Sequence, residues 1–194
     1  MVSTGDFSAF GSTSLTLNAS GLTRYSTIAI VDSGTGSTVT FNNSGANAYS
    51  DIFNVTLDNS PGAISFNGTS DFGSSALSIT TSNLTQLNAS STVKGTGGLT
   101  IRSDDIAIDS TASLDGGTST VTLRPNSAFR EIDLGTETSG KLSLTDAELD
   151  RITAGKLLIR TGSSGGDNIT VSADINLSNN TTPIPILRLD TSFG

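Results

Sequence analysis

Residues 77–101 read LSITTSNLTQLNASSTVKGTGGLTI, and this stretch decides the fold. It begins and ends with the same pattern of an apolar, a hydroxyl-bearing and an apolar residue, at Leu77-Ser78-Ile79 and Leu99-Thr100-Ile101. Alternation of apolar and polar residues over such short segments is typical of β-strands. Asn and Gly between the triplets indicate turns. We therefore expect a unit of strands and turns that recurs after 22 residues.

Triplets of this kind repeat along most of the chain in two interleaved sets. The first set advances in steps of 22, 22, 22 and 21 residues through Val55-Thr56-Leu57, Leu77-Ser78-Ile79, Leu99-Thr100-Ile101, Val121-Thr122-Leu123 and Leu142-Ser143-Leu144. Ile28-Ala29-Ile30 and Ile169-Thr170-Val171 extend it by 27 residues at either end, and residues 186–189 close it. The second set contains Leu15-Thr16-Leu17, Val39-Thr40-Phe41, Ile64-Ser65-Phe66, Ile106-Ala107-Ile108, Ile132-Asp133-Leu134 and Leu157-Leu158-Ile159, and residues 84–87 fill its one gap. Repetition at about 20–50 residues is the sequence pattern of solenoids and related repeat folds.

We interpret the two sets as an all-β solenoid, a parallel β-helix of about eight coils in a single domain over residues 1–194. Each strand lies on the equivalent strand of the next coil, because a single coil cannot bury its own apolar face. The outer members of each triplet point into the core and the middle member points out. Residues 1–13 and 181–194 are expected to be caps or edges of a longer rod, and an antiparallel sandwich is the rival fold. The core ladder predicted by the spacing contains Val55, Leu77, Leu99, Val121 and Leu142.

The composition excludes several classes of function. The chain of 194 residues is only 34% hydrophobic, which suits a narrow core with many turns. It contains no Cys and no His, so thiolate and imidazole metal sites and Ser-His-Asp catalysis are excluded. A net charge of −8 argues against nucleic acid and anionic membrane surfaces as partners. No segment approaches the roughly 20 apolar residues of a membrane span, so we expect no membrane insertion.

One segment departs from the strand pattern and predicts a short helix near residues 145–152. Thr145 and Glu148 have the spacing of a capping box at a helix N-terminus. Leu149 and Ile152 lie on one face of this helix, which we expect to pack on the surface of the coils. Gly155 is a suitable stop signal.

The run from Arg130 to Arg160, REIDLGTETSGKLSLTDAELDRITAGKLLIR, resembles a repeat of filamentous-haemagglutinin-like exoproteins, which are large bacterial proteins exported by two-partner secretion. Residues 120–126 and 168–172 continue the resemblance. It implies a right-handed β-helix, an extracellular or cell-surface location and a structural or adhesive role. It implies no catalytic residues, so we do not expect an enzyme. The expected partners are glycans, host or neighbouring cell surfaces, and further copies of the chain stacked end to end.

The middle residues of the first set form an outward column of hydroxyl groups. Its members are Thr56, Ser78, Thr100, Thr122, Ser143 and Thr170. A flat array of Thr can order water, as in ice-binding solenoids, while a solvated strand face favours Thr by propensity alone. Two residues further on, the parallel column contains Asp58, Thr80, Arg102, Arg124, Thr145 and Ser172, and its two arginines make an ice-binding surface less suitable.

Acidic residues gather in the second set of triplets, at Asp104, Asp105, Asp109, Asp115, Glu131 and Asp133. If coils stack in sequence order, Asp105 lies next to Glu131, and Ala107 lies next to Asp133. Asp105, Asp109, Glu131 and Asp133 are then candidates for binding Ca²⁺, and a carboxylate pair of this kind can also cleave glycosides. The plain interpretation is a solvated acidic face, with no cofactor. The resulting hypotheses are a structural or adhesive rod, a polysaccharide-binding or polysaccharide-cleaving protein, and an ice-binding solenoid.

Overall fold

The computed structural model describes residues 15–18, 27–32, 38–43, 54–59, 62–74, 76–162, 168–180 and 182–191. For the first four of these segments it describes the strand backbone. The strands are β1 (Leu15–Asn18), β2 (Thr27–Asp32), β3 (Thr38–Asn43), β4 (Asn54–Asn59), β5 (Ala63–Asp71), β6 (Ala76–Leu87), β7 (Thr92–Lys94), β8 (Leu99–Ile108), β9 (Ser113–Asp115), β10 (Thr120–Arg124), β11 (Ile132–Gly135), β12 (Leu142–Thr145), β13 (Ile152–Thr153), β14 (Lys156–Arg160), β15 (Ile169–Val171) and β16 (Leu187–Asp190). The helical elements are α1 (Asp146–Leu149) and the 3₁₀ turn η1 (Leu177–Asn179).

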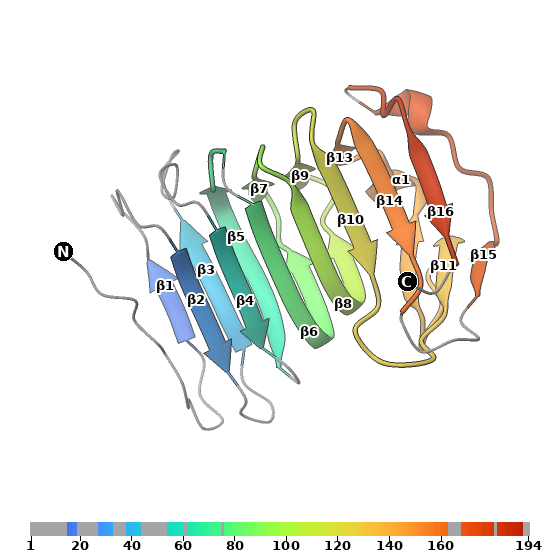
Figure 1. Ribbon diagram of the computed structural model, residues 1–194. Coiled ribbons are helices and arrows are strands. Elements are labelled where there is room, and N and C mark those ends of the chain that lie inside the picture. Colours follow the sequence, from blue (N-terminus) through green and yellow to red (C-terminus); the bar gives the residue numbers. More distant parts are fainter. Residues whose placement is uncertain are drawn as a thin grey trace.

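The protein is all-β, and the pairs between its described strands are parallel. Thirteen strands form one curled sheet, and β12, β11 and β15 form a second sheet of three. Figure 1 shows the strands stacked side by side across the molecule, from β1 at one end to β14 and β16 at the other. The curl follows from the long strands β6 and β8, each of which bends and pairs with neighbours along two parts of its length.

The paired strands fall into three rows. Row A contains β2, β4, the first halves of β6 and β8, β10, β14 and β16. Row B contains β1, β3, the first half of β5 and the second halves of β6 and β8. Row C contains the end of β5, then β7, β9 and β13. The chain visits row A, row B and row C in turn and then returns to row A.

The 22-residue register is confirmed between residues 55 and 123. Leu77 pairs with Val55 on one side and with Leu99 on the other, and Leu99 pairs with Val121. The gap in the second set is filled as expected, because Thr85 pairs with Ile64 and with Ile106. Inward positions are apolar and buried, with Ile79, Ile101 and Leu123 all at 0% exposure. Apolar burial along these rows forms one continuous core.

Beyond residue 123 the predicted order is wrong. In row A the next partner of Val121 is Leu157, on β14, and not Leu142. Leu142 pairs with Ile132 instead, in the three-stranded sheet, and Ile132 pairs with Ile169 on its other side. The physical reason is the path of the segment after β10. This segment leads to β11, which lies one strand beyond β8, and the chain then turns back to form β12 in the space between them.

This forward step places β12 between β8 and β11. The Asp105 carboxylate lies 3.5 Å from the backbone nitrogen of Ser143, at the β8 side of β12. β11 pairs with the opposite side of β12 through the neighbours Asp133 and Ser143. The expected contacts of Asp105 with Glu131 and of Ala107 with Asp133 are therefore wrong, because a whole strand separates them.

The short helix forms, but it is shorter than expected and lies in the core. Thr145 caps it, and the reciprocal capping box with Glu148 is present. The helix ends at Leu149, and Leu149 and Ile152, each 1% exposed, belong to the hydrophobic core. Gly155 lies beyond the helix, and a Cβ atom there would lie 2.1 Å from the carbonyl oxygen of Thr118. Its role is therefore close backbone packing.

The expected end segments are residues 1–13 and residues 181–194. Residues 1–13 lie outside the described residues. Of residues 181–194, the structure describes 182–191, which include strand β16 paired in register with β14. This segment thus adds a strand to row A.

Candidate functional site

The first four members of the predicted hydroxyl column occupy matching strand positions, and the last two do not. Thr56, Ser78, Thr100 and Thr122 are neighbours on successive strands of row A. The next positions in the row are Leu158 and Arg188, which have no place in a Thr array. Ser143 and Thr170 belong to the three-stranded sheet, where each pairs with Asp133. The column is interrupted because β14, rather than β12, continues row A.

Ser143 is also buried rather than outward and solvated. Only 1% of it is exposed, because the loop between β11 and β12 covers it. Its hydroxyl donates to the carbonyl oxygen of Thr138 at 3.0 Å and accepts from the backbone N–H of Thr138 at the same distance. These bonds fix the loop on the sheet.

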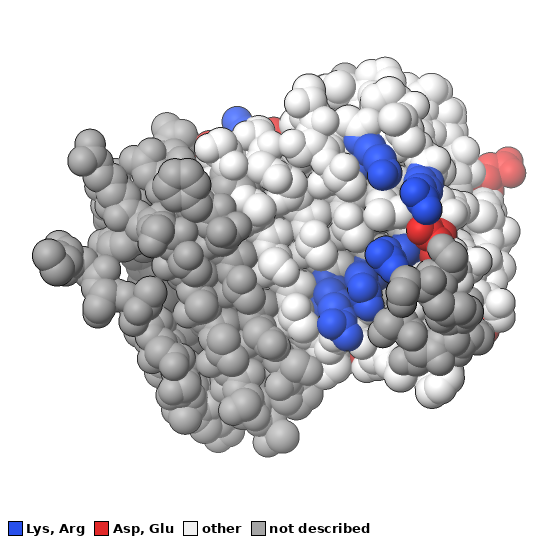
Figure 2. All heavy atoms as spheres, viewed as in Figure 1, with Lys and Arg blue, Asp and Glu red and all other residues white. Residues whose placement is uncertain are grey.

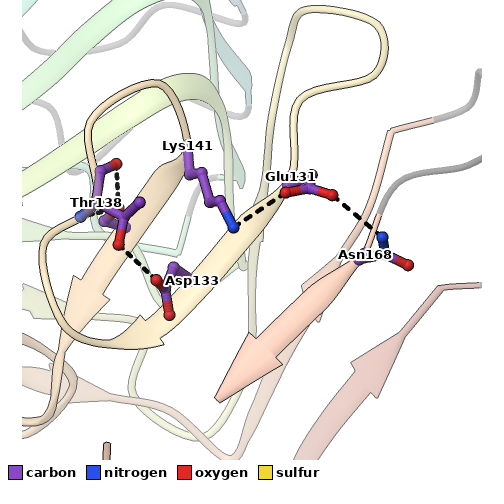
Figure 3. Close-up of polar contacts among 6 residues, drawn as sticks. Glu131, Asp133, Thr138, Lys141 and Asn168 are labelled. Atoms are coloured by element: carbon purple, nitrogen blue, oxygen red, sulfur yellow. Dashed lines mark hydrogen bonds and ion pairs between the residues drawn. The ribbon is translucent and has the colours of Figure 1, made fainter. Parts of the chain in front are cut away.

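Two of the acidic candidates, Glu131 just before β11 and Asp133 within it, have separate partners (Figure 3). Glu131 forms an ion pair with Lys141 at 3.0 Å and accepts a hydrogen bond from the Asn168 side chain at 3.1 Å. These contacts hold the pKa of Glu131 below its ordinary value, chiefly through Lys141. Asp133 is buried and accepts from the Thr138 hydroxyl at 2.5 Å. Both carboxylates therefore link the ends of β11 to neighbouring segments.

The other two candidates, Asp105 and Asp109, lie near the end of β8. Asp105 is half-buried, and burial raises the pKa of its carboxyl group. Asp109 is exposed and accepts hydrogen bonds from the backbone N–H and the hydroxyl of Thr111, at 2.9 and 2.8 Å. These bonds lower its pKa and close a turn. The four candidates are thus not gathered in one place, and the described residues contain no group of three or more acidic side chains arranged to hold a metal ion.

A different set of carboxyl groups comes together at the helix. Glu148 is 8% exposed, and its two oxygens accept from the backbone N–H groups of Ile108 and Thr145, both at 3.0 Å. Glu137 lies on the loop between β11 and β12, where its carboxyl group interacts with those of Glu148 and Asp105. Burial of this group, followed by the contact with Glu148, raises the pKa of Glu137 to about 7. Sequence spacing did not bring Glu137 and Glu148 together, because their contact depends on the fold of the loop.

Asp104 is a structural residue that the sequence placed on a solvated face. It is 7% exposed and accepts from the backbone N–H groups of Asn126 and Ser127, at 3.1 and 2.6 Å. Arg130 donates to the carbonyl oxygen of Asp104 at 2.6 Å and to that of Lys141 at 3.0 Å. Together these residues fix the segment between β10 and β11, which carries the chain forward in row B.

Three arginines lie on neighbouring strands at the outer face of row A. Arg102 and Arg124 are neighbours on β8 and β10. Arg160 occupies the equivalent position on β14, one residue after the last paired residues of β10 and β14. We call Arg102, Arg124 and Arg160 the arginine strip. Figure 2 shows Lys and Arg side chains gathered on this face of the molecule.

The arginine strip is only partly matched by partners within the protein. Among the described residues no ion pair joins any of the three to a carboxylate, and their Nε atoms are shielded from solvent without a hydrogen-bond acceptor. Arg102 makes one weak contact, from Nη2 to the carbonyl oxygen of Asn126 at 3.5 Å. Burial and the two neighbouring guanidinium groups lower the pKa of Arg124. The strip therefore presents three adjacent positive charges that form no ion pair within the described residues, on a protein of net charge −8.

Within the described segments, no helix is long and apolar enough to cross a membrane. In comparisons with known proteins, no family model, no curated protein and no solved structure matches the chain.

Proposed function

We propose that the three rows form a right-handed β-helix of about eight coils and that this helix is a stiff rod of a secreted bacterial surface protein. The rod spaces or presents an adhesive face, and its role is structural rather than catalytic. The resemblance of residues 130–160 to filamentous-haemagglutinin-like exoproteins supports the handedness and the extracellular location.

The observation that carries this proposal is the unbroken apolar ladder along row A. Leu77, Leu99, Val121 and Leu157 lie on four successive strands and are 2%, 1%, 0% and 0% exposed. Each coil buries its apolar residues against the coils on either side, so neighbouring coils stabilise one another. Such a stack resists bending, because bending would separate paired backbone groups along a whole row.

The ends of the rows support a role in a longer assembly. Leu187 and Leu189 continue the inward ladder of row A from Leu157 and Ile159, yet they are 41% and 42% exposed. Backbone groups and apolar side chains at the edge of a parallel stack are suited to pairing with another strand. A further coil, from this chain or from a second copy, would cover them.

The second candidate function is polysaccharide binding, because the arginine strip is a specific site at which an acidic sugar chain can bind. Polysaccharide cleavage is not favoured, because β12 separates Asp105 from Asp133 and the expected carboxylate pair does not form. Ice binding is not favoured either, because Leu158 and Arg188 interrupt the expected column of hydroxyl groups.

Deleting one complete coil tests the proposed helix. Residues 77–98 contain one visit to each row, and their removal would bring Leu99 next to Val55. The shortened chain should fold cooperatively with an unchanged β-sheet circular dichroism spectrum per residue. A matched deletion of residues 77–87 removes half a coil and should prevent folding, because inward and outward positions no longer match. Unfolding of the first variant, or equal folding of both, would contradict the helix.

The presenting role needs a separate measurement. Beads coated with the folded chain should attach to bacterial or host cell surfaces, and beads carrying the same density of heat-unfolded chain should not. Equal attachment of both bead types would show that adhesion does not depend on the rod.

A further inference from the structure

We propose that the arginine strip is a binding site for an acidic polysaccharide whose sugar units carry carboxylate groups. The inference deepens the proposed adhesive role by naming what the rod holds, and it depends on the row A register rather than on the location of the protein.

The spacing of the strip is the first argument. Arg102, Arg124 and Arg160 occupy equivalent positions on three neighbouring strands, so their Cα atoms repeat at the strand spacing of about 4.8 Å. The strip runs across the strands, along the direction in which the coils stack. Arginine side chains are long and adopt many rotamers, so guanidinium groups spaced along the strip can meet carboxylates that recur along one side of an extended chain of uronic acid units.

The unmatched donors are the second argument. Buried donors without acceptors are uncommon in native proteins, and each calls for a missing partner. The Nε atoms of all three arginines are such donors within the described part of the protein. Each side chain as a whole remains partly exposed, so a ligand can approach the guanidinium group from the solvent side. A guanidinium group matches the geometry of a carboxylate and binds it with two parallel hydrogen bonds.

The surroundings of the strip favour a sugar chain over other polyanions. Thr100 and Thr122 lie next to Arg102 and Arg124 on the same face and offer hydroxyl groups to sugar hydroxyls. The outward positions of β6, β8, β10, β14 and β16 contain no aromatic residue. Single-stranded nucleic acids are held largely by stacking of bases on aromatic side chains, which this face lacks.

Charge at the ends limits the length of the site. Asp190 is the neighbour of Arg160 on β16 and forms an ion pair with Arg188 at 2.9 Å. At the opposite end, Thr80 follows Arg102 on β6 and carries no charge. The strip is therefore three strands long and suits a short run of acidic sugars.

The test uses the full chain and a fluorescent oligomannuronate of six units, in a calcium-free buffer of low ionic strength. The matched neutral ligand is β-1,4-mannohexaose, which has the same backbone without carboxylates. We expect saturable binding of the acidic oligomer, none of the neutral one, and loss of binding at high salt. Arg124→Gln should weaken the affinity about tenfold, because it removes the central charge-assisted contact.

Two variants separate recognition from general charge. Lys94→Gln removes the same charge from β7 in row C and should leave the affinity unchanged. Arg124→Lys keeps the charge but loses the forked geometry, and it should bind more weakly than the wild type. Circular dichroism and urea unfolding of each variant exclude a folding defect as the cause.

Four outcomes would overturn the proposal. They are no binding of the acidic oligomer, equal binding of the neutral oligomer, equal weakening by Lys94→Gln and Arg124→Gln, and tighter binding of an oligothymidylate than of oligomannuronate. A chain that passes the coil-deletion test and fails to bind would overturn this site alone and leave the rod intact.

Discussion

Glu148 accepts a hydrogen bond at 3.0 Å from the backbone N–H of Ile108, which lies 40 residues earlier in the chain. Arg151 donates to the carbonyl oxygen of the same residue at 2.8 Å. The side chains of Glu148, in the helix, and Arg151, just after it, thus bond both backbone groups of Ile108 and take the place of a neighbouring strand at the end of β8. The capping box predicted from sequence thus also ties the helix to row B.

Glu148→Ala should destabilise the protein by about 2–4 kcal/mol, because it leaves the buried N–H of Ile108 without an acceptor and breaks the helix cap. Urea unfolding followed by circular dichroism measures the loss. Glu131→Ala removes a partly exposed carboxylate beside β11, in the three-stranded sheet, and should have little effect. A similar change for both variants would show that Glu148 does not support β8.

Leu99→Asp should prevent folding or cost several kcal/mol, because it places an unpaired carboxylate between Leu77 and Val121. Leu99→Ala should cost about 2–5 kcal/mol through the cavity it leaves. Thr100→Ala, one residue along and on the outer face, is the matched control and should be nearly neutral. Thermal melting checks all three, and an unchanged melting temperature for Leu99→Asp would refute the inward placement of this residue.

Stability should fall as the pH rises from about 4.5 through 7, because of Glu137. Its pKa in the folded protein is raised to about 7 from 4.5, so the folded state binds the proton more tightly than the unfolded chain. Its contribution is complete below the unfolded pKa and is lost as the pH rises through the folded one. Asp105 acts in the same direction, while Asp109, Glu131 and Asp133, whose pKa values are lowered, act only in more acidic solution.

Comparing the wild type with Glu137→Gln isolates this effect. The free energy of unfolding of the variant should fall less between pH 5 and pH 8, and the Glu137 carboxyl signal in carbon NMR should titrate near neutrality. An ordinary titration, or identical pH profiles for the two proteins, would show that Glu137 does not contact Glu148.

Periodicity predicted the strand pairing correctly wherever the spacing stays constant. From Val55 to Val121 every step is 22 residues, so the pairs of strands could be read directly from the triplets. Leu142 carries the same pattern at nearly the same step, yet it belongs to another sheet. Its placement depends on Asp104, whose side chain holds the segment after β10, and no repeat in the sequence encodes such a contact.

The candidate sites, too, could be predicted only where the spacing of the triplets is constant. Arg102 and Arg124 were visible as neighbours in the column beside the hydroxyl groups, because both lie within the constant region. Arg160 joins them only once β14 is known to follow β10. The acidic candidates were placed by assuming sequence order in row B, and the insertion of β12 separates them.

The stacking order after β10 is tested most directly by disulfide cross-linking, since the chain has no cysteine of its own. Thr122 and Leu158 are neighbours on β10 and β14, so a Thr122→Cys/Leu158→Cys variant has its Cα atoms about 4.8 Å apart, within the range for a disulfide. Mild oxidation of the folded monomer should form this bond, seen as a loss of two mass units and of both free thiols. A Thr122→Cys/Ser143→Cys variant should keep its thiols. Cross-linking of the second pair and not of the first would contradict the strand order described above.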